Sequence, residues 1–130
     1  MVFVVEDDPD LRMALGDVLV GEGLCPVLFS TAQKVLSALD REIPAAIITD
    51  LVMPGMSGTQ LLGALRSDNR LRGIPVVVMT GTNDTALPVR LDAPIVYKPD
   101  LNGLLRALAA VLLQHRTTVV VETLHDEEHT

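Results

Sequence analysis

The sequence predicts an α/β domain in which helices cover both faces of a five-stranded parallel sheet, so that three layers result. Five short apolar runs recur along the 130 residues, and segments with helical spacing lie between them. The runs are continuous instead of alternating, as expected for strands buried on both faces, and the alternation of strand and helix favours right-handed βαβ units. A chain of this length forms one domain with its own core.

The predicted strands are rich in β-branched residues, too short for helices, and mostly bounded by Pro, Gly or Asp. They are Val2–Val5, Cys25–Phe29, Ala45–Ile48, Ile74–Met79 and Pro94–Tyr97. Because free cysteines are commonly buried, we expect the single cysteine, Cys25, to be a small core residue.

Helix start signals follow three of these strands. Asp8-Pro9 supplies an N-cap with a proline at the first helical position. Ser30 is a candidate cap for the second helix, and Ser57 precedes the third. The strongest helical pattern runs from Asp100 to Leu113, where apolar residues recur along one face.

The segment between the fourth and fifth strands has little amphipathic pattern. Pro88 interrupts it between Thr82 and Asp92, so we expect a short or degraded fourth helix there. We place the domain at residues 1–113 and treat residues 114–130 as a C-terminal tail that is partly disordered or docks. The apolar triplet Val119–Val121 keeps the docking alternative open.

Charge and composition exclude several classes of function. The net charge is −7 and the ten Lys and Arg residues are scattered, so we expect no direct nucleic-acid binding. No charge-free run reaches the roughly 18 residues of a membrane-spanning helix. A single cysteine and an N-terminus without a signal-peptide pattern favour the cytoplasm.

Polar residues follow four of the predicted strands. Because parallel strands end at one edge of a sheet, where open α/β folds bind ligands, these residues should converge in space. They are Glu6-Asp7-Asp8 after the first strand, Asp50 after the third, Thr80-Gly81 after the fourth and Lys98-Pro99 after the fifth.

Clustered carboxylates repel one another, so this edge should bind a cation or shift its pKa values. Oxygen ligands without a nearby histidine select a hard ion, and a partly hydrated Mg²⁺ fits best. With the ammonium of Lys98 and the hydroxyl of Thr80, the edge would cradle a phosphoryl group. Asp50 is the candidate nucleophile, since carboxylates form aspartyl-phosphates.

Four segments together resemble the receiver domain of bacterial two-component response regulators, a CheY-like fold. They are Phe3–Asp8, Asp50–Gly58, Val78–Gly81 and Tyr97–Pro99, in the family's order, and the resemblance covers about Val2 to Leu113. It implies a flavodoxin-like, doubly wound sheet with strand order 2-1-3-4-5. It also implies a signalling domain that catalyses only its own phosphorylation and dephosphorylation.

The resemblance assigns roles to individual residues. Asp50 would accept a phosphoryl group from the phosphohistidine of a sensor histidine kinase or phosphotransfer protein. Asp8 and Asp50 would bind Mg²⁺ directly with the backbone carbonyl of Val52, and Asp7 would act largely through water. Glu6 is interpreted as a solvated charge or as a support for the site.

Thr80 would bond a phosphoryl oxygen, Lys98 would pair with the phosphate, and Lys98-Pro99 would be a cis peptide. The switch would involve Thr80 with Ile95, which occupies the family's aromatic position, and Tyr97. A downstream protein target or output domain would receive the signal, and a homodimer is a further option.

Other interpretations remain open. Asp7 and Asp8 could simply cap the first helix. A phosphohydrolase with an aspartyl nucleophile of the haloacid-dehalogenase type would want a second aspartate at the position of Val52. A receiver-like module that docks partners without being phosphorylated is the main alternative.

Overall fold

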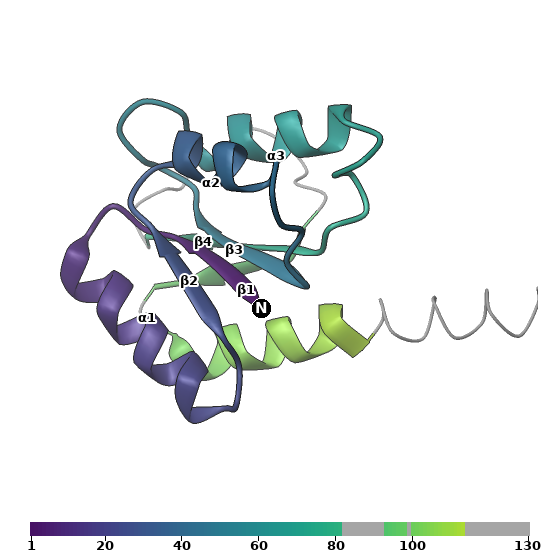
Figure 1. Cartoon of the computed structure of the whole chain (residues 1–130). Coiled ribbons are helices and arrows are strands. Elements are labelled where there is room, and N and C mark those ends of the chain that lie inside the picture. The colour runs from purple at the N-terminus through teal and green to yellow at the C-terminus, as the bar shows by residue number, and fades with distance from the viewer. Residues whose placement is uncertain (82–92, 99, 114–130) are drawn as a thin grey trace, which may run out of the picture.

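The computed structural model describes residues 1–81, 93–98 and 100–113 (Figure 1). The strands in this part of the chain are β1 (Val2–Val5), β2 (Pro26–Phe29), β3 (Ala46–Asp50), β4 (Val76–Thr80) and β5 (Ile95–Tyr97). The helices are α1 (Pro9–Gly21), α2 (Ala32–Ala38), α3 (Gly58–Ser67) and a helix over residues 101–113. These elements lie close to the predicted ones.

All five strands pair in parallel, in the order β2-β1-β3-β4-β5, which confirms the predicted flavodoxin-like topology. The pairing register brings the carboxyl ends of neighbouring strands level. Val5 lies opposite Thr49, and Thr80 lies opposite Tyr97. The residues that follow β1, β3, β4 and β5 therefore share one edge of the sheet.

The sheet separates two apolar cores. On one face α2 and α3 pack over Phe3, Val5 and Ile47, and on the other α1 and the helix of residues 101–113 pack over Val4 and Ile48 (Figure 1). Alternate residues of one strand thus enter opposite cores, as the period of two requires. Because β1, β3 and β4 are buried along their whole length, the strand ends are held rigidly.

The helices begin where side chains satisfy their free backbone N–H groups. Asp8 is the N-cap of α1, and its carboxylate accepts from the amides of Asp10 and Leu11. Ser57 caps α3 in a reciprocal pair with Gln60. Thr31, and not the predicted Ser30, caps α2, because only the Thr31 hydroxyl accepts the Lys34 amide.

Three predicted features differ from the structure or lie outside its described residues. Cys25 is exposed, because it precedes β2 at the open edge of the sheet, so the prediction of a core residue was wrong. The third strand extends to Asp50 itself. The short fourth helix within residues 82–92, the peptide state of Pro99 and the tail of residues 114–130 lie outside the described residues.

Two glycines shape the turn between Asp50 and α3. Gly55 has a φ of 77°, which favours glycine. Gly58 has no positive φ, but a side chain there would collide with the backbone carbonyl of Asp50 and would lie 2.9 Å from Leu51 Cα. Its amide also donates to Leu51 O at 2.8 Å, so Gly58 closes the start of α3 against the end of β3.

We expect Gly58→Ala to lower the free energy of unfolding by about 2 kcal/mol, because the added methyl group meets backbone that cannot swing away. Gly63→Ala, in the same helix, is the matched control: nothing lies within 4 Å of its added Cβ. That change should stabilise the protein by up to about 1 kcal/mol. Urea denaturation followed by circular dichroism measures both, and equal effects would contradict the close approach at Gly58.

Candidate functional site

The predicted polar residues do converge at the carboxyl edge of the sheet. Asp50 ends β3, Thr80 ends the neighbouring β4, and Lys98 follows β5 on the far side of β4. Glu6 and Asp7 follow β1, which flanks β3 on its other side. Segments up to 92 residues apart in sequence, from Glu6 to Lys98, therefore meet at one place.

Lys98 ties the two sides of this edge together. Its Nζ lies 2.8 Å from Asp50 Oδ2 and 2.9 Å from Glu6 Oε2. Its backbone amide donates to Thr80 O at 2.8 Å, which extends the pairing of β4 and β5 by one residue. One ammonium group thus pairs with two carboxylates from separate strands.

Three carboxylates form a compact acidic group at this edge: Glu6, Asp7 and Asp50. Ligand oxygens of the three lie within 4.8 Å of one another. Glu6 and Asp50 are buried, whereas Asp7 is exposed. The group offers oxygen donors only, which is the donor type that hard divalent cations prefer.

The surroundings shift the pKa values of two groups. Burial raises the pKa of Glu6, and the charge of Asp50 adds to this rise, although the hydrogen bond from Lys98 opposes it. Burial would by itself lower the pKa of Lys98, but its hydrogen bonds to Asp50 and Glu6 outweigh burial and raise it. Lys98 is therefore firmly cationic, and one positive charge faces three acidic side chains.

Glu6 contributes more than the sequence suggested. It is 1% exposed and is therefore no solvated charge. Its Oε2 pairs with Lys98, its Oε1 accepts from the amide of Asp8 at 3.1 Å, and its own amide donates to Phe29 O. The residue continues β1 beyond its assigned end and supports the site from within the sheet.

Asp8 is not one of the three clustered carboxylates. Its Oδ1 is 3.0 Å from the amide of Asp10, so the carboxylate caps α1. The interpretation of Asp8 as a metal ligand stays a prediction, and the geometry favours Asp7 in that role. The signal for this was present in Asp8-Pro9, because a proline at the first helical position fixes the preceding residue as the cap.

The remaining predicted residues differ in burial and in position along their strands. Thr80 is fully buried. Val52 lies in the turn after β3, and its side chain is 61% exposed. Ile95 and Tyr97 both belong to β5, but Ile95 is half-buried whereas Tyr97 is 51% exposed. Of the two, Tyr97 is the one paired in register with Thr80.

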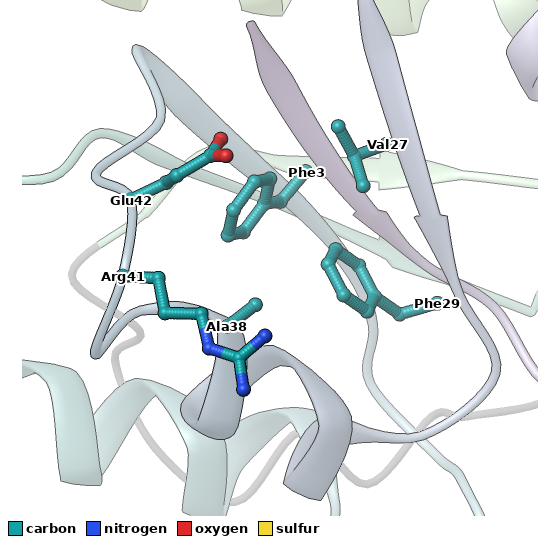
Figure 2. Close-up of a pocket in the computed structure, with 6 residues that line it drawn as sticks. All are labelled: Phe3, Val27, Phe29, Ala38, Arg41 and Glu42. Atoms are coloured by element: carbon teal, nitrogen blue, oxygen red, sulfur yellow. The ribbon is translucent and has the colours of Figure 1, made fainter.

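A separate pocket of about 250 Å³ lies between β2 and the end of α2 (Figure 2). The rings of Phe3 and Phe29 pack edge to face with centroids 4.9 Å apart, and both line this pocket. Arg41 and Glu42 lie on the side of the connection to β3. None of the converging acidic residues lines this pocket, so it is distinct from the site at the sheet edge.

Comparisons with known proteins agree with this geometry. The family model described as "Response regulator receiver domain" matches residues 2–93. The DNA-binding response regulator MtrA of Mycolicibacterium smegmatis is 36% identical over 84 residues, which are 65% of this chain and 36% of MtrA. The response regulator protein FleR of Pseudomonas aeruginosa is 44% identical over 79 residues, 61% of this chain and 16% of FleR.

These curated relatives are longer proteins, and the chain spans well under two thirds of their length. An uncharacterized 14.6 kDa protein of Leptolyngbya boryana is closer in size: it is 35% identical over 79 residues, which cover 61% of this chain and 60% of that protein.

Among the described residues, no helix is long and apolar enough to cross a membrane.

Solved structures share the fold over most of the chain. A sensor protein from Polaromonas sp. JS666 superposes with a TM-score of 0.80 at 28% identity, covering 88% of this chain and 96% of that one. Full-length FixJ from B. japonicum superposes with a TM-score of 0.82 at 27% identity, covering 97% and 64%. With the family match over residues 2–93, this likeness means that the chain belongs to the receiver domain family of two-component response regulators.

Proposed function

We propose that Asp50 is the phosphoacceptor of this receiver domain and takes its phosphoryl group from the phosphohistidine of a sensor histidine kinase or phosphotransfer protein. The observation that carries the proposal is the contact of Lys98 Nζ with Asp50 Oδ2 at 2.8 Å, beside the carboxylates of Glu6 and Asp7. The carboxylate proposed as nucleophile, a paired ammonium and two further carboxylates that could hold a metal ion lie together there.

The position of Asp50 suits nucleophilic attack. Its Oδ2 is held by Lys98, and among the described residues no hydrogen bond engages Oδ1. An Asp50 oxygen would form the new O–P bond while the P–N bond to the donor imidazole breaks, and the imidazole nitrogen would keep the bonding pair and take up a proton. Lys98 would offset negative charge on the phosphoryl oxygens as the group transfers.

The residues present fit a bound Mg²⁺. Three carboxylates facing a single ammonium leave excess negative charge at the edge, and their oxygens are close enough to share one ion. We expect Asp7 and Asp50 to hold Mg²⁺ with the backbone carbonyl of Val52, while Glu6, already paired with Lys98, supports them. When bound, the ion would neutralise charge on the phosphoryl oxygens.

The switch would operate through the ends of β4 and β5. A phosphoryl group adds close to two negative charges beside Thr80 and Lys98, and both side chains could move toward that charge. The hydrogen bond from the Lys98 amide to Thr80 O couples the two strand ends. A movement of Thr80 would therefore displace Tyr97, its partner in the register of β4 and β5. Ile95, half-buried at the family's aromatic position, cannot offer the same aromatic swing, so we assign the exposed aromatic role to Tyr97.

The partners follow from this chemistry. The receiver would pass its state to a downstream protein target or an output domain, as in a cytoplasmic signalling chain, and a homodimer is one form that this surface could take. The main competing function is a receiver-like module that docks its partners without phosphorylation. The intact set of Asp7, Asp50, Thr80 and Lys98 favours phosphorylation over docking alone.

Lys98→Met should lower the free energy of unfolding of the metal-free protein by about 3 kcal/mol, because it leaves the buried carboxylates of Glu6 and Asp50 without their cation. Excess Mg²⁺ should restore part of this loss by binding only the folded state. Lys34→Met removes an ammonium that, within the described part of the chain, bonds the Ser30 hydroxyl and no carboxylate, so it should change stability by less than about 0.5 kcal/mol. Equal losses in urea denaturation would contradict the charge argument.

Two aspartate variants separate the ligand interpretations. Asp7→Asn should weaken Mg²⁺ binding about tenfold or more, since it removes a charged ligand. Asp8→Asn should leave the affinity within about threefold and keep α1 stable, because asparagine caps a helix as well as aspartate does. Isothermal titration calorimetry measures both affinities. A larger loss of Mg²⁺ affinity in Asp8→Asn than in Asp7→Asn would instead favour Asp8 as the metal ligand.

Asp50→Asn should abolish labelling by acetyl phosphate, because the amide cannot form the acyl phosphate. Asp17→Asn, an exposed change on α1, should label like wild type. The added phosphoryl mass in intact-protein mass spectrometry is the measurement. Wild-type protein that neither labels nor binds beryllofluoride in Mg²⁺ would overturn the phosphoacceptor function and support the docking module.

A further inference from the structure

We propose that Arg12 is a positioning residue for the Mg²⁺ site: it fixes the turn that carries Glu6 and Asp7 and so presets the Asp7 carboxylate. The inference rests on the proposed function, because Asp7 is taken there as a metal ligand. Arg12 belongs to α1, yet its Nη1 reaches back six residues and donates to the backbone carbonyl of Glu6 at 2.9 Å. The side chain is half-buried.

Arg12 lies where a positive charge is electrostatically unfavourable, unless its side chain makes a compensating contact. Its amide donates to the carbonyl of the N-cap, Asp8, at 2.9 Å, so the residue lies at the start of the first helical hydrogen bonds. A positive charge at this end opposes the helix dipole. Among the described residues, the contact with Glu6 O is the only side-chain hydrogen bond of Arg12, and no carboxylate pairs with it.

The contact completes the fixation of the turn. The Glu6 amide donates to Phe29 O, its Oε2 pairs with Lys98, and its Oε1 accepts from the Asp8 amide. Arg12 holds the remaining polar group of the residue, the carbonyl, which shares a peptide unit with the amide of Asp7. The orientation of that peptide unit sets the position of the Asp7 backbone, from which the Asp7 side chain projects.

Asp7 depends on this orientation more than its neighbours do. Glu6 and Asp50 are buried and paired with Lys98, but Asp7 is exposed and no described residue bonds its carboxylate. Its direction therefore follows from the backbone. The hydrogen bond from Arg12 to the carbonyl of the preceding residue, Glu6, would thus orient Asp7 from outside the coordination sphere of the metal.

Charge and positioning make opposite predictions for this residue. The guanidinium is a permanent cation near the acidic group, so it repels Mg²⁺, and its removal should tighten binding if charge dominates. If positioning dominates, removal should weaken binding because Asp7 is no longer preset. The sign of the change thus distinguishes the two effects.

The test compares Mg²⁺ affinities of the whole chain by isothermal titration calorimetry. Arg12→Met keeps the apolar stem and removes both charge and donor, and we expect its dissociation constant to rise about tenfold. Arg12→Lys keeps an ammonium donor and should stay within about threefold of wild type. Arg72→Ala removes the same charge from the exposed loop before β4, at the other end of the strands, and should leave the affinity unchanged.

A second measurement does not depend on metal. In the metal-free protein, Arg12→Met should shift the backbone amide resonances of Asp7 and Asp8 in ¹⁵N NMR spectra while those of β3 and β4 stay in place. Unchanged or tighter Mg²⁺ binding by Arg12→Met would overturn the positioning role. Absence of Mg²⁺ binding by wild type would instead overturn the proposed function.

Discussion

The position of one ammonium group between two buried carboxylates organises this domain. Glu6 and Asp50 end up 1% and 6% exposed, and such charges are costly to bury unless they are paired. Lys98 meets both at 2.8–2.9 Å, so β1, β3 and β5 must end at the same level. The pairing is incomplete because Asp7 adds a third carboxylate. That residual negative charge would favour a divalent ion at this edge, and the bound ion would in turn favour a phosphoryl group.

The fold can hold this arrangement because the strands below it are rigid. β1, β3 and β4 are buried on both faces, and their parallel register leaves little freedom at the carboxyl ends. Flexible connections would let like charges move apart and relieve the repulsion. Gly58 adds a second constraint, because its missing side chain lets α3 start directly against the carbonyl of Asp50.

The same edge joins chemistry to signalling. The backbone hydrogen bond from Lys98 to Thr80 links the lysine that would pair with the phosphoryl group to β4, the strand that would respond to it. Tyr97, next to Lys98 and half-exposed, would transmit the change to the surface. On the other side of Asp50, the hydrogen bonds of Glu6 and the contact from Arg12 would fix the turn that carries the proposed metal ligand Asp7.

The sequence alone determined the layered sheet, the convergence of Asp50, Thr80 and Lys98 and the family resemblance, because apolar runs, helix caps and strand-end motifs are local signals. The strand order followed from that resemblance and was confirmed by the pairing of the strands. The sequence could not separate the functions of consecutive acidic residues. Whether Glu6 is buried and whether Arg12 reaches the Glu6 carbonyl depend on how the turn after β1 packs against Phe29 and Lys98. Only the tertiary structure decided these, since each contact joins residues whose separation in space no local pattern encodes.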